Sequence, residues 1–248
     1  MLTILVMPSY AKDDFGLGKI SSTSALKNPI AQNEVMDNLR KRADLEITRR
    51  VASLTELITR INGLKKLSQT NKTALINKVQ EEITSLNTLK TKIDADTDLT
   101  TLRTDVKSIV QSYRVYAFYI PQIRILAAAD GLNQSADNLA TLSAKLQTLI
   151  TGSGATGETL TSLQSYISDM NLKIKEANDT YQLIETEVLA LTPAGYPANK
   201  ATLEDARAKL KIASKAIKTA RDDAKQIVKI LRSLNKNLKA TKSAEFEK

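Results

Sequence analysis

The chain has 248 residues, a net charge of +9, and neither histidine nor cysteine. Without these two residue types, the common zinc, iron and copper ligand sets and the Ser-His and Cys-His nucleophile pairs cannot be built. We therefore expect no bound metal, no cofactor and no enzymatic activity. The chain also lacks tryptophan and holds only eight glycines and five prolines, which favours long uninterrupted helices.

The first eleven residues have the pattern of the end of a signal peptide. Residues 2–7 are apolar, and the small residues Ser9 and Ala11 stand just before the charged residues that begin at Lys12. Small residues at this spacing are typical of a signal-peptidase site. The alternative is an ordinary apolar N-terminus. We expect residues 1–11 to be a signal-peptide remnant of an exported protein and residues 12–32 a flexible leader.

Apolar residues then recur at alternating spacings of three and four, the heptad pattern of helices that pack side by side. Turn-forming residues divide this pattern, most clearly at Gly152–Gly157 and at Pro193–Pro197. The later part of the chain contains no apolar run long enough to span a bilayer. The expected helices occupy residues 33–63, 75–93, 99–151, 160–191 and 203–238.

Pro121 falls inside the third expected helix, where it removes a backbone donor and clashes with the preceding turn. Either one long helix kinks there or two helices abut. Short turns between long helices predict antiparallel packing. We expect an all-α, elongated antiparallel bundle or coiled coil of about five long helices, with a spectrin-repeat-like arrangement. Residues 33–120 would form one three-helix unit, residues 121–242 another that shares the third helix, and residues 243–248 a tail.

Nearly all of the net charge lies in the last expected helix. Residues 200–242 hold thirteen Lys or Arg and only four Asp or Glu. A one-sided basic stripe is typical of helices that bind anionic lipid headgroups or surface polymers, although a solvated outer face also collects charge. Nucleic acid is a weaker candidate, because no aromatic residues interleave for base stacking. The candidate polyanion-binding residues are Lys211, Lys215, Lys218, Lys225, Lys229, Arg232, Lys236 and Lys239.

The segment 115–129 is the most apolar and aromatic part of the chain after its start. At fifteen residues it is too short to span a membrane alone. It is either a core layer around Pro121 or a contact patch for a partner or a membrane. The candidate patch residues are Tyr116, Phe118, Tyr119, Ile120 and Ile123.

The acidic run Asp94-Ala-Asp96-Thr-Asp98 has the spacing that begins a calcium loop, with Asp105 at the twelfth position. Leu99 stands where such a loop needs glycine, and no glutamate closes it. Capping of the next helix by Asp96 or Asp98 explains these residues better.

Three strings, SLTELITRINGLKKLS, KIDADTDLTTLRTDVKSI and SYRVYAFYIPQIRILAAAD, resemble an uncharacterised family of predicted secreted proteins from small-genome bacteria of the candidate phyla. The likeness continues more loosely through SYISDMNLKIKEAN and covers most of residues 45–240. The resemblance implies export and a helical fold. It assigns no activity and no functional residues.

Together these patterns predict an exported, non-enzymatic helical protein with a structural or interaction role at the cell envelope. The basic last helix would bind anionic surface polymers or lipid headgroups. One alternative is a membrane-active, pore-former-like protein that inserts residues 115–129. A weaker alternative is a cytosolic rod associated with nucleic acid. The sequence does not define a protein partner or an oligomeric state.

Overall fold

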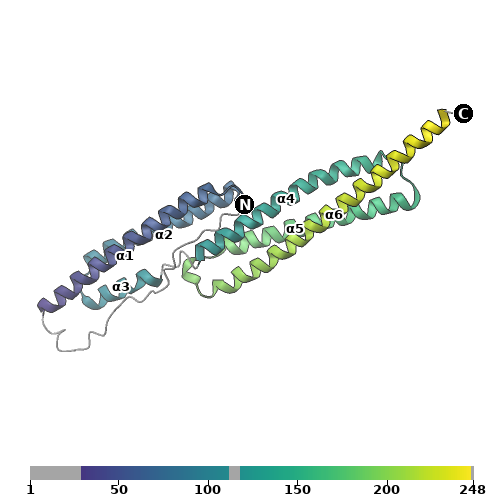
Figure 1. Ribbon diagram of the computed structural model, residues 1–248. Helices are drawn as coiled ribbons and strands as arrows, with labels where there is room; N and C mark the ends of the chain where they lie inside the picture. Colours follow the sequence, from purple (N-terminus) through teal and green to yellow (C-terminus); the bar gives the residue numbers. More distant parts are fainter. Residues whose placement is uncertain (1–28, 112–117, 247–248) are drawn as a thin grey trace. The chain divides into compact units, whose positions relative to one another are not determined.

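The computed structural model describes the backbone of residues 29–111 and 118–246, and the side chains of residues 29–109 and 118–236. These residues are almost entirely helical and contain no strand, which confirms the all-α class. The signal-peptide remnant and most of the leader, residues 1–28, lie outside the described residues. The α-helices within the described ranges (Figure 1) are α1 (Pro29–Gly63), α2 (Gln69–Ala95), α3 (Leu99–Gln111), α4 (Ile120–Thr151), α5 (Gly157–Ala190) and α6 (Asn199–Phe246).

Several boundaries differ from the expected ones. Helix α1 begins at Pro29 rather than at residue 33, because the fixed φ of proline suits the first turn of a helix. Pro121 likewise lies in the first turn of α4, where its missing N–H leaves no intrahelical bond unmade. Helix α6 continues to Phe246, into the expected tail. A kink that joins α3 to α4 stays a prediction, because residues 112–117 lie outside the described residues.

The described helices fall into two units. One contains α1 up to Leu54, α2 from Glu81 onward, and α3. The other contains residues 55–80, which are the end of α1, the turn after it and the start of α2, together with α4, α5 and α6. The expected division at residue 120 and the elongated shape stay predictions.

The first unit packs its helices through a narrow apolar seam. Polar contacts flank this seam. Arg40 on α1 donates a hydrogen bond to the carbonyl of Asp96 at 2.6 Å, and Lys92 Nζ lies 3.0 Å from Asp105 on α3. Asp96 packs beside Asp105, and burial together with this neighbouring carboxylate raises the pKa of Asp96. The buried seam residues include Leu39, Ala43, Ile47, Leu86, Ile93, Leu102 and Val106.

Asp98 caps the N-terminus of α3. The backbone N–H of Thr101 donates to Asp98 Oδ2 at 2.7 Å, and the Thr101 hydroxyl donates to the same oxygen at 2.9 Å. These bonds hold the pKa of Asp98 below its ordinary value. Helix capping is therefore confirmed for this acidic segment. In the described ranges, no group of three or more carboxylates is placed to hold a metal ion.

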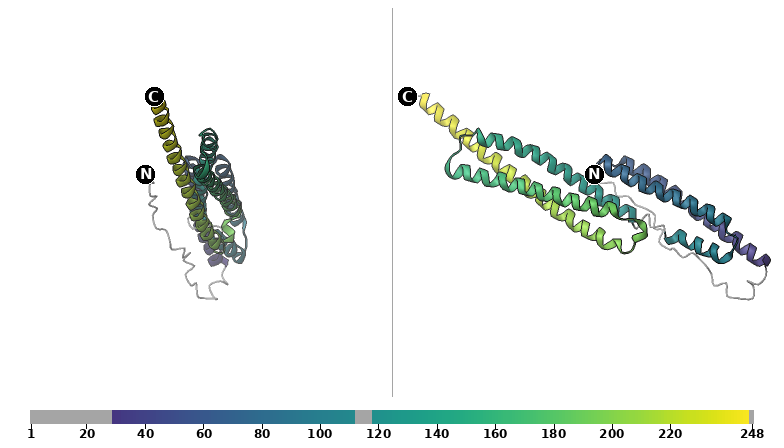
Figure 2. Two further views of the ribbon diagram at one scale, coloured as in Figure 1. Left: turned by 90° about the vertical axis from the view of Figure 1, so that its right-hand side faces the viewer. Right: turned by 180° about the vertical axis from the view of Figure 1, so that it is seen from behind.

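In the second unit, α4, α5 and α6 form an antiparallel three-helix bundle (Figures 1 and 2). The loop between α4 and α5 uses Gly154 and Gly157, which have φ of 66° and 58°, a region that favours glycine. The predicted heptad seams of α5 and α6 are confirmed as the core of this bundle. Its buried members include Leu146, Ile150, Leu163, Ile167, Met170, Ile174, Ala213, Ile217, Ala220 and Ile227.

A buried carboxylate, Asp130 on α4, ties the turn between α1 and α2 to the bundle. The backbone N–H of Ser68 donates to Asp130 Oδ2 at 2.7 Å, and Asn71 Nδ2 lies 3.0 Å from Oδ1. From α5, the Tyr181 hydroxyl lies 3.0 Å from Oδ1 and 2.7 Å from Glu185. Burial and these two carboxylates raise the pKa of Tyr181. One side chain thus joins three segments distant in sequence.

The C-terminal end of α5 is capped from two other helices. Gln122 on α4 donates through Nε2 to the carbonyl of Val188 at 2.7 Å. Lys78 on α2 donates to the carbonyls of Leu189 and Leu191. The last carbonyls of a helix lack the usual intrahelical donors, so these side chains supply donors there, in addition to the Leu191 N–H that donates to the Val188 carbonyl at 3.4 Å.

Replacing Asp130 tests the importance of this network. Asp130→Ala removes the acceptor of the Ser68 N–H and of the buried Asn71 side-chain amide, while Tyr181 keeps its bond to Glu185. We expect the free energy of unfolding to fall by about 2–3 kcal/mol. Urea denaturation followed by circular dichroism measures the change. Asp137→Ala is the matched control, because Asp137 is an exposed aspartate two turns further along α4. An equal loss of unfolding free energy in both variants would show that the Asp130 network adds no stability beyond that of an exposed aspartate.

Candidate anion-binding site

The structure places the predicted basic stripe on the outer face of α6. Every stripe residue with a described side chain is exposed, while the seam residues between them are buried, among them Ala213, Ala216, Ile217, Ala220, Ala224 and Ile227. The helix has one apolar seam, and burying it turns the cations outward. The exposed members are Lys211, Lys215, Lys218, Lys225, Lys229, Arg232 and Lys236, whereas the side chain of Lys239 lies outside the described part.

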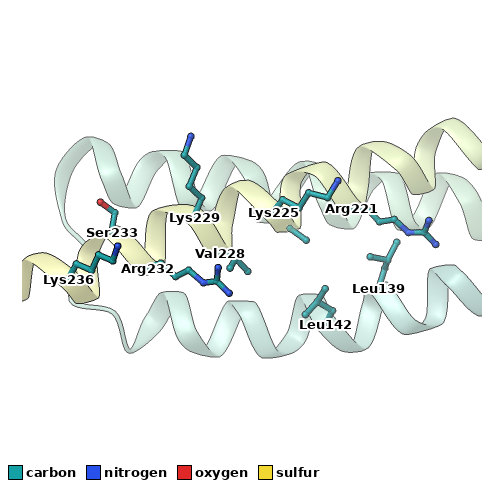
Figure 3. Close-up of a pocket in the computed structure, with 10 residues that line it drawn as sticks. Leu139, Leu142, Arg221, Lys225, Val228, Lys229, Arg232, Ser233 and Lys236 are labelled. Carbon is teal, nitrogen blue, oxygen red and sulfur yellow. The ribbon is translucent and has the colours of Figure 1, made fainter.

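Part of this stripe borders a groove between α6 and α4. The groove has a volume of about 690 Å³. Its floor and α4 wall are apolar, formed by Leu139 and Leu142 of α4 with Ala224 and Val228 of α6. Arg221 and Arg232 reach from α6 toward the leucines of α4 (Figure 3). The remaining lining residues are Lys225, Lys229, Ser233 and Lys236.

The groove divides the stripe into two parts. The four cations from Lys225 to Lys236 line it, whereas Lys211, Lys215 and Lys218 do not. The first part of the α6 seam consists mainly of alanine, and from Ile227 onward it changes to larger aliphatic residues. Larger side chains hold helix axes further apart, which accounts for a groove along this part of α6.

Arg221 is a groove residue that the sequence analysis missed. The predicted stripe contains only cations directly opposite the apolar seam, whereas Arg221 lies beside the seam. Val228, seven residues later, occupies the same helical face and also lines the groove. A search for cations flanking the seam on the α4 side would have found Arg221, but the sequence does not say which flank faces α4.

The carboxylates of α6 leave most of the groove cations uncompensated. Asp222 pairs with Lys225 at 2.7 Å, and this bond lowers the pKa of Asp222. Among the described side chains, no carboxylate lines the groove. By contrast, Lys209 near the start of α6 is bound by Glu187 and Asp205, which raise its pKa. Lys209 therefore links helices, while the groove cations face solvent.

Asp223 faces the other flank of α6, toward α5. It is buried, and this burial together with the nearby carboxylates of Asp169 and Asp222 raises its pKa to about 6, against the partial opposition of Lys173. The helix thus turns one of its two adjacent aspartates inward, away from the groove. The α4 side of α6 stays free of negative charge at the groove.

The candidate apolar patch is corrected by the structure. Phe118, Tyr119 and Ile123 are buried, and Ile120 is half-buried. The rings of Phe118 and Tyr119 pack edge to face, with their centroids 5.2 Å apart. They form part of a packed interior rather than an exposed contact surface, because aromatic rings of this size are stabilised by burial. Tyr116 lies outside the described residues. None of the described helices combines the length and apolar character needed to cross a membrane.

Asp223→Asn tests the inward aspartate through the pH dependence of stability. Because its folded pKa is raised, the native state holds this proton up to about pH 6, while the unfolded chain releases it near 3.8. This group's stabilisation is therefore lost as pH rises through that window. Asparagine does not titrate, so above about pH 7 we expect Asp223→Asn to unfold about 2–4 °C higher than the native chain.

Differential scanning calorimetry across this pH range measures the effect. Asp222→Asn is the control, because the pKa of Asp222 is lowered and its replacement removes a favourable pair. An increase in the unfolding temperature of Asp223→Asn that is equal at pH 4 and pH 7 would contradict the proposed effect of Asp223 ionisation on stability.

Comparison with protein-family models, with curated proteins and with solved structures found no match for this chain. The resemblance to the secreted family of candidate-phyla bacteria therefore stays a prediction, and the candidate site rests on its own geometry.

Proposed function

We propose that the protein is an exported, non-enzymatic interaction protein of the cell envelope that binds anionic partners through α6. The observation that carries this proposal is the row of cations along the α4–α6 groove, from Arg221 to Lys236, with no described carboxylate in the lining. At 1.5 Å per residue this row is roughly 22 Å long, enough to contact several anionic groups at once.

The electrostatics favour a partner with repeated negative charge. Each Lys or Arg near an anionic surface contributes about 1 kcal/mol. Four of the five groove cations have no described ion pair that a partner would need to break; the exception is Lys225. Binding of this kind weakens as salt screens the charges.

Other functions have less support. The groove lining contains no aromatic side chain, and aromatic stacking is a main source of affinity for single-stranded nucleic acid. The lining also has no carboxylate to act as a general acid or base, and the chain has no histidine. Export is supported by the small residues before the charged segment at Lys12.

Neutralising the groove cations tests the proposal. We expect Lys229→Gln, Arg232→Gln and Lys236→Gln together to weaken binding to soluble polyphosphate on the order of 100-fold at low salt. The matched control combines Lys211→Gln, Lys215→Gln and Lys218→Gln, which removes the same charge from the same helix outside the groove. This control should change the affinity by no more than about threefold.

Isothermal titration calorimetry at two salt concentrations provides the measurement. Equal losses in the two triple variants would mean that net charge, rather than the groove, decides binding. No binding by the native chain at low salt would end the proposal.

A further inference from the structure

The face of α4 that borders the groove carries two exposed leucines that do not pack in the bundle core. Leu142 lines the groove and is 38% exposed. Leu149 follows seven residues later, on the same face of α4, and is 58% exposed. The core positions of this helix are filled by Leu139, Leu146 and Ile150, which are all buried. Packing of α4, α5 and α6 therefore does not account for Leu142 and Leu149.

The cations of α6 and the exposed Leu142 of α4 thus lie on facing walls of one groove, and Leu149 continues the same face of α4 beyond it. Arg221 and Arg232 reach across α6 toward the α4 wall, and Val228 lies between them, half-buried (Figure 3). A ligand that satisfies both walls has negative charge and apolar surface side by side. This is the composition of an anionic lipid bilayer at the level where headgroups meet acyl chains.

We propose that the α4–α6 face docks on an anionic lipid bilayer. The cations of α6 engage the headgroups, while Leu142 and Leu149 enter the apolar edge of the bilayer. This inference rests on the proposed anion binding and names its partner. It assigns two contributions to attachment: one from charge, which salt screens, and one from leucine burial, which salt does not screen.

Other occupants fit the face less well. A soluble anionic polymer leaves the leucines in water. A second copy of the chain would bring its own positive α6 face against this one. Residues 1–28 carry three lysines and two aspartates, so this segment has no net negative charge to offer the groove. An acidic helix of a protein partner is an outcome of the test below.

The first experiment separates lipid from polymer. The full chain and its variants are sedimented with mixed phosphatidylcholine–phosphatidylglycerol vesicles and titrated with soluble polyphosphate. We expect Leu142→Ser with Leu149→Ser to weaken vesicle binding roughly tenfold and to leave polyphosphate binding unchanged. The matched control is Leu172→Ser with Leu183→Ser, because these leucines of α5 are 62% and 54% exposed and lie outside the groove.

A second experiment reports insertion without removing any leucine contact. The chain has no tryptophan, so Leu149→Trp places a single indole at the proposed contact. We expect its emission to shift to shorter wavelength with the anionic vesicles and to keep part of this shift at high salt. Leu172→Trp, on α5, should show no shift.

The outcomes distinguish this inference from the function on which it rests. Two results overturn the lipid inference and leave anion binding intact. One is polyphosphate binding without vesicle binding, and the other is vesicle binding that the Leu142 and Leu149 substitutions do not change. An acidic amphipathic peptide that binds the groove more tightly than vesicles do also overturns it. Failure of the native chain to bind either polyphosphate or vesicles defeats both.

Discussion

The packing of α6 against α4 and α5 is the interaction on which the rest of the second unit depends. A helix with one apolar seam can bury only that seam. Once the seam packs against neighbouring helices, the direction in which every other side chain points is fixed. In α6 most of the buried seam before Ile227 is alanine, with Leu203 and Ile217 as its larger members. The outward direction of the lysines, the inward direction of Asp223 and the position of the groove all follow from this arrangement.

The polar contacts of the bundle have a different role from its apolar seam. Leucine and isoleucine contacts stabilise the helices but discriminate weakly between registers that differ by one heptad. Asp130 accepts hydrogen bonds from fixed positions on the α1–α2 turn and on α5, and Gln122 reaches one particular carbonyl at the end of α5. A shifted register would leave these buried groups unpaired, at a cost that apolar contacts do not impose. The network thus specifies which alignment of the helices is native.

The periodic features of the fold could be predicted from the sequence, whereas features that depend on two helices at once could not. The expected helix at residues 160–191 corresponds to α5, Gly157–Ala190, because its heptads are unbroken and glycines bound its start. Asp98 was recognisable as a cap from its place before an apolar periodic run. Asp130 gives no such signal, since one aspartate in a seam does not reveal its partners. Likewise, the stripe on α6 was visible, but Arg221 and the leucine wall of the groove required the position of α4.

The segment around Phe118 and Tyr119 shows a related limit. High apolar content predicts equally a buried layer and an exposed contact surface, because the same transfer free energy drives both. Only the surrounding structure decides between them, and here it buries both rings. Leu142 and Leu149 show the opposite result. They belong to an ordinary heptad pattern, yet the structure leaves both side chains exposed.

The groove has walls from two helices that are about eighty residues apart in the chain, Leu139 and Leu142 on one side and Arg221 to Lys236 on the other. A ligand that touches both walls finds its site only in the folded bundle, because the unfolded chain does not bring them together. Folding and ligand binding are then thermodynamically linked, so that ligand in excess of its dissociation constant draws the equilibrium toward the assembled helices. Attachment to a surface would in this way also protect the bundle against unfolding and proteolysis.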